Sequence, residues 1–290
     1  MRRTGAAIAA VAFVSVGAAA VLWGPDLLSE DAPVPERERC YVTVDQARTY
    51  ELPLDSANNA ALISGVAFQR GYGLNGMTVG LATAIQESGL RNLDWGDRDS
   101  LGLFQQRPSQ GWGTPEEIQD PYYSTNTFYA ALEKVDGWES MRVTDAAQAV
   151  QRSGYPEAYG DHEEEARAWA RAFTGDADAV VTCAVNTVAP GTAEAFAARV
   201  LADLGPSYSV EVLDQDTTSV ELGVTPLDDS DESLRALQAW AIATASQTSV
   251  EWVDRAGVRW DRAGSWATET PPEQFAHYRG IRVGVTIGEA

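Results

Sequence analysis

The chain has 290 residues, of which 44% are hydrophobic, and this length and composition suit a packed core divided between two modest domains. Acidic residues outnumber basic ones by 42 to 21, and the formal net charge is -21. Nucleic acids carry the same sign of charge and would be repelled at long range, so we predict no nucleic-acid partner.

The N-terminus has the composition of an export segment. Arg2 and Arg3 precede an uncharged apolar run over residues 6–23, which is just long enough to span a bilayer core of about 30 Å. Three alanines at 18–20 also offer a small-residue cleavage site. We therefore assign residues 1–39 to a signal anchor followed by a tether, and we expect one N-terminal helix to hold the chain in the membrane. The alternative is a signal peptide that is cleaved, after which the chain is secreted. Either arrangement places the rest of the protein outside the cytoplasm.

Only two cysteines occur in the chain, Cys40 and Cys183. In an oxidising compartment such a pair is expected to form one disulfide, which would join the two ends of a first domain over residues 40–186. Two buried free thiols are the alternative interpretation.

Helical periodicity dominates this first domain. Met77 to Ser88 carries apolar residues on one face and ends at Gly89, whose backbone suits a helix C-terminus, so Glu87 falls in the last helical turn. The stretch 91–123 is rich in Gly, Asp, Pro and aromatic residues, which predicts ordered loops. The other predicted helices of the domain span 56–70, 124–135, 144–151 and 162–173.

The pattern changes beyond residue 186, and we predict a second, small domain over residues 187–290. Helix, strand, strand is followed by the same order again and by a last strand, which suggests a degenerate α-β-β repeat. The expected helices span 193–204 and 233–244, and the expected strands span 208–213, 219–224, 249–254, 258–261 and 281–287. The fold class is therefore α+β, a mainly α domain followed by a small α+β domain. This second domain has no chemical motif.

Two short motifs in the first domain carry the chemistry. Gln86-Glu87-Ser88-Gly89 ends the second helix, and Gly102-Leu103-Phe104-Gln105 begins fifteen positions after Glu87. Together they resemble the lytic transglycosylase and goose-type lysozyme superfamily, whose motifs are Glu-Ser at a helix end and Gly-Leu-Met-Gln at this spacing. Phe104 stands where the family has methionine, at a position expected to line the glycan groove.

The resemblance implies a lysozyme-like fold in which Glu87 protonates the glycosidic oxygen of a peptidoglycan glycan strand. Burial beside apolar neighbours would favour the protonated carboxyl that this step requires. As in lytic transglycosylases, the same residue would then act as a base on the sugar's own hydroxyl. From the family positions, Ser88 and Gln105 are expected to orient the substrate or Glu87.

A hydrolytic enzyme would need a second carboxylate. Goose-type lysozymes place acidic residues in the loop after the catalytic helix, and the candidates here are Asp94, Asp97 and Asp99. We take Asp97 and Asp99 as candidate substrate-binding residues.

The third family motif, a Tyr-Asn pair on a later helix, is not matched. Val150 stands where the tyrosine is expected, and Gln151 could partly replace the asparagine. Tyr155 or Tyr159 could supply the hydroxyl from the following loop, and we place Tyr155 among the candidate substrate-binding residues. Trp112, in the loop region, offers a flat face of the kind that stacks on sugars.

These features predict an enzyme that cleaves peptidoglycan glycan strands, as a lytic transglycosylase or a muramidase, without a metal or other cofactor. Two alternatives stay open. The domain could bind glycan without turnover, because the motif tyrosine is missing, or it could be structural, with the C-terminal domain docking a cell-envelope protein.

Overall fold

The computed structural model describes residues 38–186, 189–275 and 277–287, and these residues belong to one compact unit. The fold is α+β, as predicted. Within the described residues the principal α-helices are α1 (Leu54–Gln69), α2 (Leu74–Ser88), α3 (Pro115–Gln119), α4 (Pro121–Leu132), α5 (Val143–Gln151), α6 (Glu163–Phe173), α7 (Ala193–Leu204), α8 (Asp231–Ala243) and α9 (Ala245–Thr248). The strands are β1 (Arg39–Val44), β2 (Arg48–Pro53), β3 (Ala179–Ala184), β4 (Tyr208–Gln215), β5 (Ser219–Pro226), β6 (Val250–Arg255), β7 (Val258–Asp261), β8 (Trp266–Thr268) and β9 (Ile281–Thr286).

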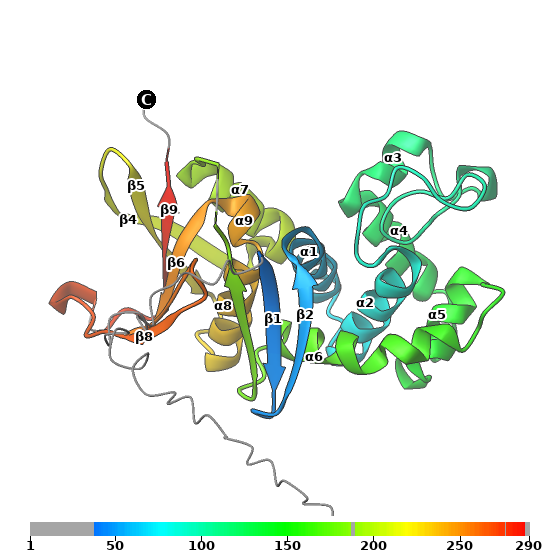
Figure 1. Ribbon diagram of the computed structural model, residues 1–290, viewed down its shortest axis with the longest axis horizontal. Helices are drawn as coiled ribbons and strands as arrows, with labels where there is room; N and C mark the ends of the chain where they lie inside the picture. Colours follow the sequence, from blue (N-terminus) through cyan, green and yellow to red (C-terminus); the bar gives the residue numbers. More distant parts are fainter. Residues whose placement is uncertain (1–37, 187–188, 276, 288–290) are drawn as a thin grey trace, which may run out of the picture. The chain divides into compact units, whose positions relative to one another are not determined.

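The local sequence explains where the helices of the first half begin and end. Gly89 ends α2 in the left-handed conformation, as predicted, with φ of 64°. Thr114 and Glu117 form a reciprocal capping box at the start of α3. The Asp120 carboxylate accepts from the first backbone N–H groups of α4. Helices α2 to α5 lie together at one end of the compact unit (Figure 1).

A three-stranded antiparallel sheet, ordered β2-β1-β3, packs against α1, α6 and α8 and is absent from the sequence prediction. Its strands have six residues each, and β1 pairs with β3 across the length of the first half, so local periodicity gave little signal for it. Cys40 lies directly opposite Cys183 in this pairing, and the two form the predicted disulfide. Both cysteines are fully buried, and the disulfide fits an extracytoplasmic location.

The second half forms a six-stranded antiparallel sheet ordered β4-β5-β9-β6-β7-β8. Helices α7 and α8 and the strands β4 to β7 and β9 follow the predicted helix-strand-strand order, and the short strand β8 is additional. The buried residues of β5 and β9 pack with α8 in the hydrophobic core.

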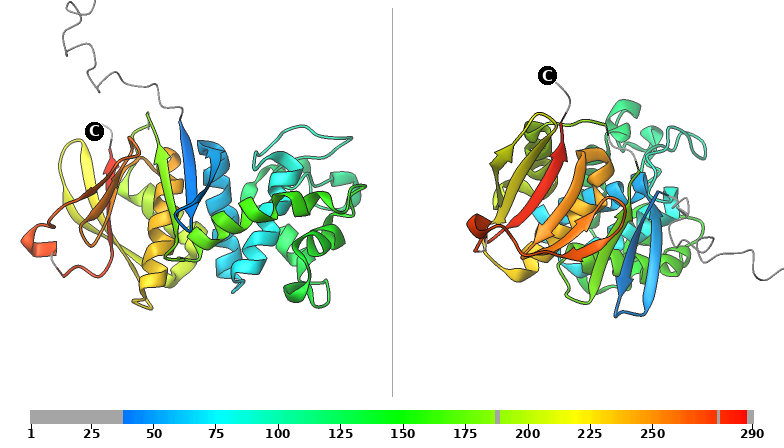
Figure 2. Two further views of the ribbon diagram at one scale, coloured as in Figure 1. Left: turned by 60° about the horizontal axis from the view of Figure 1, so that its bottom comes forward. Right: turned by 60° about the vertical axis from the view of Figure 1, so that its left-hand side comes forward.

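Contacts between the two halves are extensive. Helix α8 packs against both β6 and β3, and α1 contacts α7, α8 and α9. The Trp260 indole N–H donates to the carbonyl oxygen of Cys183 at 3.2 Å, which links the two sheets. Figure 2 shows α6, in green, crossing in front of α1 and α2 in its left view, and α6 also contacts α8. The boundary near residue 186 stays a prediction, because both halves lie within one compact unit.

The prediction of a membrane-anchoring N-terminal helix is corrected. Its basis, the apolar run over residues 6–23, lies outside the described residues. Over 38–186, 189–275 and 277–287, no helix combines the length and apolar character needed to cross a bilayer.

Candidate functional site

Glu87 lies at the end of α2, in the position that the motif predicted. Its Oε1 accepts a hydrogen bond of 2.7 Å from the Tyr159 hydroxyl. Tyr159 is fully buried in a short 3-10 helix (Ala158–His162) that contacts both α2 and α5. Burial, together with the charge of Glu87, raises the pKa of Tyr159 above its usual range, so this phenol is a hydrogen-bond donor at neutral pH.

Ser88 joins the two predicted motifs. Its buried hydroxyl lies 2.7 Å from the carbonyl oxygen of Leu103 and 3.0 Å from that of Ala84. Gln151, from α5, donates to the carbonyl oxygen of Phe104 at 2.9 Å. The Gly-Leu-Phe-Gln segment is thus held from both sides, by the end of α2 and by α5. The Ser88 hydroxyl forms its hydrogen bonds with backbone carbonyl oxygens.

The segment between Leu101 and Gln106 is a tight turn whose ends pair with each other. Gly102 has φ of +76°, and a Cβ atom there would lie 2.8 Å from the carbonyl oxygen of Ile118. The motif therefore needs glycine at this position. Phe104 is fully buried and stacks on Phe128 with ring centroids 4.4 Å apart. It therefore belongs to the core, and the expectation that it lines the groove is wrong.

A groove of about 1140 Å³ runs past Glu87. Its walls come from the end of α2, the loop before α3, the end of α4 and the end of α5 with the loop that follows. Of the predicted site residues it brings together Glu87, Asp97 and Gln105, and Trp112 and Val150 line it as well. The sequence analysis missed the four basic groove residues, Arg98, Arg107, Lys134 and Arg152. The only available signal was that Lys134 is the single lysine of an acidic chain.

The two acidic candidates in the loop have different surroundings. Asp97 lines the groove, and its side chain is 93% exposed, with an ion-pair contact of 3.9 Å to Arg98. Asp99 accepts from Arg107 at 2.7 Å and from the backbone N–H of Ser109 at 2.8 Å. Hydrogen bonds from Ser109 and Arg107 hold the pKa of Asp99 well below its usual range. Asp99 is thus engaged in shaping the loop, whereas Asp97 faces the groove.

The two tyrosine candidates differ in their exposure to solvent and in their contacts. Tyr155 is 79% exposed and is not among the described residues that line the groove. Tyr159, four positions later, donates to Glu87. Gln105 lines the groove, with its Nε2 at 3.3 Å from the carbonyl oxygen of Gly102.

This arrangement can hold one carboxyl group in a fixed orientation on the wall of a large polar groove. Comparison of the sequence with models of protein families gives no match, and comparison with curated proteins gives none.

Proposed function

We propose that this protein cleaves the glycan strands of peptidoglycan, with Glu87 as the general acid and then the general base. The observation that carries the proposal is the placement of Glu87, which lines the groove while its Oε1 accepts from the buried Tyr159 hydroxyl. The proposal rests also on the resemblance of the two motifs to lytic transglycosylases and goose-type lysozymes.

The hydrogen bond suggests which carboxyl oxygen would carry the proton. The Tyr159 phenol is protonated at neutral pH and donates its hydrogen to Oε1 of Glu87. Oε1 is therefore the acceptor, and Oε2 is the oxygen that would hold the acidic proton. Transfer of that proton to the glycosidic oxygen would leave a carboxylate, which the Tyr159 hydroxyl stabilises through a stronger, charge-assisted bond. The bond between the anomeric carbon and the protonated glycosidic oxygen would break, and the leaving sugar would depart as an alcohol. The carboxylate would then take a proton from the remaining sugar's own hydroxyl, whose oxygen bonds to the anomeric carbon and gives an anhydro product.

Asp97 is the described carboxylate that shares the groove with Glu87 and could serve a hydrolytic variant. Its side chain is almost fully solvated, so its charge would be screened and would stabilise a cationic transition state weakly. We therefore favour the transglycosylase route, in which one carboxyl group performs both proton transfers.

We place this activity outside the cytoplasm, where the buried Cys40–Cys183 disulfide would persist. We propose that the chain is secreted, a route for which the alanines at 18–20 offer a cleavage site.

A second candidate function is glycan binding without turnover. Val150 favours it, because this apolar side chain lines the groove where the family has a tyrosine. The same groove and the same basic residues would then serve recognition alone.

The test is digestion of purified peptidoglycan, followed by separation and mass analysis of the released fragments. General acid catalysis typically contributes about 10²–10⁴-fold, so Glu87→Gln should release fragments at least about a hundredfold more slowly than the wild type. Glu116→Gln is the matched control, because Glu116 is exposed on α3 and does not line the groove among the described residues. Equal rates for wild type and Glu87→Gln would refute the catalytic role. Retention of the wild-type protein on peptidoglycan without fragment release would instead support the binding function.

A further inference from the structure

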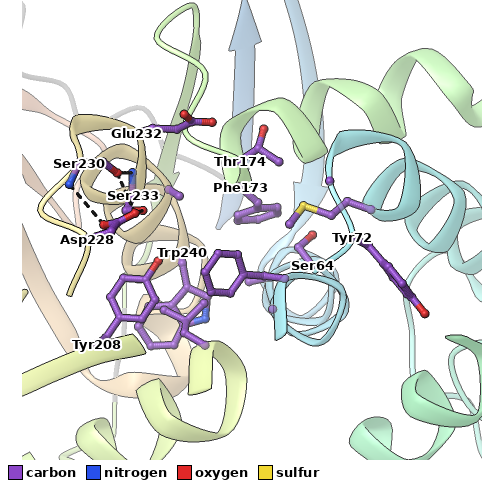
Figure 3. Close-up of a pocket in the computed structure, with 17 residues that line it drawn as sticks. Ser64, Tyr72, Phe173, Thr174, Tyr208, Asp228, Ser230, Glu232, Ser233 and Trp240 are labelled. Carbon is purple, nitrogen blue, oxygen red and sulfur yellow. Dashed lines mark hydrogen bonds between the residues drawn. The ribbon is translucent and has the colours of Figure 1, made fainter. Parts of the chain in front are cut away.

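A second pocket lies where the two halves of the chain meet, apart from the groove at Glu87. It has a volume of about 280 Å³ and is bordered by α1, the start of α2, the end of α6, β4 and the start of α8 (Figure 3). Met77 lines it from α2, ten residues before Glu87, which corresponds to about 15 Å along the helix axis. The two sites therefore lie toward opposite ends of one helix.

The inner wall of this pocket is apolar. Phe173, Trp240 and Met77 line it and are at least nine-tenths buried. Tyr208 and Phe68 lie nearer to solvent, with ring centroids 6.1 Å apart. A wall of this kind favours an apolar or aromatic body of a ligand.

One polar group in this wall has no partner. Ser64 is 2% exposed, and its Oγ has no hydrogen-bond partner among the described residues. By contrast, the hydroxyls of Thr78, Thr83 and Thr244 each donate to the carbonyl oxygen four residues earlier. Figure 3 shows the Ser64 hydroxyl directed toward the side of the pocket where Phe173 lies. A buried unpartnered hydroxyl is unfavourable, and a hydrogen bond to a ligand would remove that cost.

The mouth of the pocket is acidic. Asp228 and Glu232 line it, and the described lining residues include no Lys, Arg or His. Oδ2 of Asp228 accepts from the hydroxyls of Ser233 at 2.7 Å and Ser230 at 3.1 Å, which fix the carboxylate beside the Tyr208 ring (Figure 3). These hydrogen bonds, that from Ser233 foremost, lower the pKa of Asp228, so it stays ionised at neutral pH.

We propose that this pocket binds a small cationic amphiphile, a molecule with an aromatic or apolar body and one primary amine. The body lies against Phe173 and Trp240 and offers a hydrogen-bonding group to Ser64, while the amine lies at Asp228 and Glu232. The combination of an apolar wall, an unpartnered buried hydroxyl and a mouth of two carboxylates selects for charge as well as for shape.

The test uses tryptamine as the probe and calorimetric titration of the full chain as the measurement. Tryptamine carries an indole N–H and an amine, and tryptophol is its neutral counterpart with a hydroxyl in place of the amine. Ion pairs at exposed carboxylates are weak, so tryptamine should bind only about fivefold more tightly than tryptophol, and added salt should reduce the difference. Indole-3-propionate, with the opposite charge, should bind more weakly than either.

Three variants separate the proposal from a general effect on folding. Asp228→Asn combined with Glu232→Gln should weaken tryptamine binding about fivefold and leave tryptophol binding unchanged. Ala236→Leu should block both ligands, because Ala236 lines the pocket. Asp231→Asn is the matched control, since Asp231 is exposed in the same helical turn and does not line the pocket among the described residues.

Three outcomes would overturn the proposal: no binding of tryptamine up to its solubility limit, equal binding of tryptamine and tryptophol, or tryptamine binding that neither the mouth variants nor Ala236→Leu reduces. The result is independent of catalysis, because Glu87→Gln should bind tryptamine as the wild type does.

Discussion

Asp203 offers the sharpest test of how the two halves of the chain are held together. It lies on α7 and is fully buried, and its carboxylate accepts hydrogen bonds from Tyr122 at 2.5 Å, from Arg199 at 2.8 Å and from the Trp240 indole at 2.8 Å. Tyr122 lies in the first turn of α4 and Trp240 belongs to α8, so one carboxylate joins three helices. Arg199 is only 20% exposed and depends on Asp203 for its charge partner.

The replacement Asp203→Asn keeps the size of the side chain and removes its charge. Breaking a buried ion pair by losing one partner costs about 3–5 kcal/mol, and the partial exposure of Arg199 places our expectation at the lower end, about 3 kcal/mol. The asparagine amide would also direct N–H donors toward groups that are themselves donors, leaving at least one of them unpaired. For a unit of this size, such a loss lowers the melting temperature by about 6–12 °C.

Urea unfolding followed by circular dichroism measures the change in the free energy of unfolding. Glu194→Gln, an exposed change on the same helix, should alter it by less than about 0.5 kcal/mol. Tyr122→Phe removes one of the three hydrogen bonds and should cost about 1–2 kcal/mol. A loss below about 1 kcal/mol for Asp203→Asn would refute the view that this carboxylate is a main link between the halves.

Three further predictions address the site, the disulfide and the acid response. Tyr159→Phe should lower the rate of fragment release by about 10–100-fold, which corresponds to the roughly 1.5–3 kcal/mol of a hydrogen bond to a charged group. Tyr155→Phe is the control, because Tyr155 is exposed. Equal rates for wild type and Tyr159→Phe would show that the hydroxyl is dispensable. Replacing both Cys40 and Cys183 by serine opens a loop of 143 residues and should lower the free energy of unfolding by up to about 5 kcal/mol in urea titrations; an unchanged midpoint would contradict the role of the disulfide. Folding lowers the pKa of Asp99, so this carboxylate stabilises the fold above its unfolded pKa of about 3.9, and that contribution is lost as pH falls toward the folded pKa. Between pH 6 and pH 2 the melting temperature of Asp99→Asn should therefore fall less steeply than that of the wild type. Parallel curves would contradict a contribution of Asp99 to the acid response.

The helices that carry the candidate site could be predicted because their signals are local. The apolar spacing of Met77 to Ser88 and the glycine after it indicate α2 and its C-terminal end, and they place Glu87 in its last turn; the helix itself begins three residues earlier than predicted, at Leu74. Strand β5 buries every second side chain and was found for the same reason, whereas β9 is buried along almost its whole length.

The pairing of distant segments carried no such signal. Strand β1 pairs with β3, which lies more than a hundred residues away in the sequence. The only sequence signal that brought these segments together was the expected disulfide between Cys40 and Cys183. The carboxylate of Asp203 and the basic lining of the groove likewise arise from residues brought together by tertiary packing. A single sequence shows the types of these residues but not their neighbours.

The position of the missing motif tyrosine shows why spacing alone was an incomplete guide to this site. In the proposed chemistry a hydroxyl beside the Glu87 carboxyl stabilises the carboxylate, and any element that reaches this point in space can supply it. Here Val150 ends up on the groove wall, and the chain continues beyond α5 into a 3-10 helix that packs on α2, where Tyr159 is buried and donates to Oε1. Because the phenol is held by packing on two helices, its position relative to Glu87 is set by the core. Under the proposed function, Val150 departs from the pattern of the proteins that the two motifs resemble, while Tyr159 supplies a hydroxyl beside the Glu87 carboxyl group.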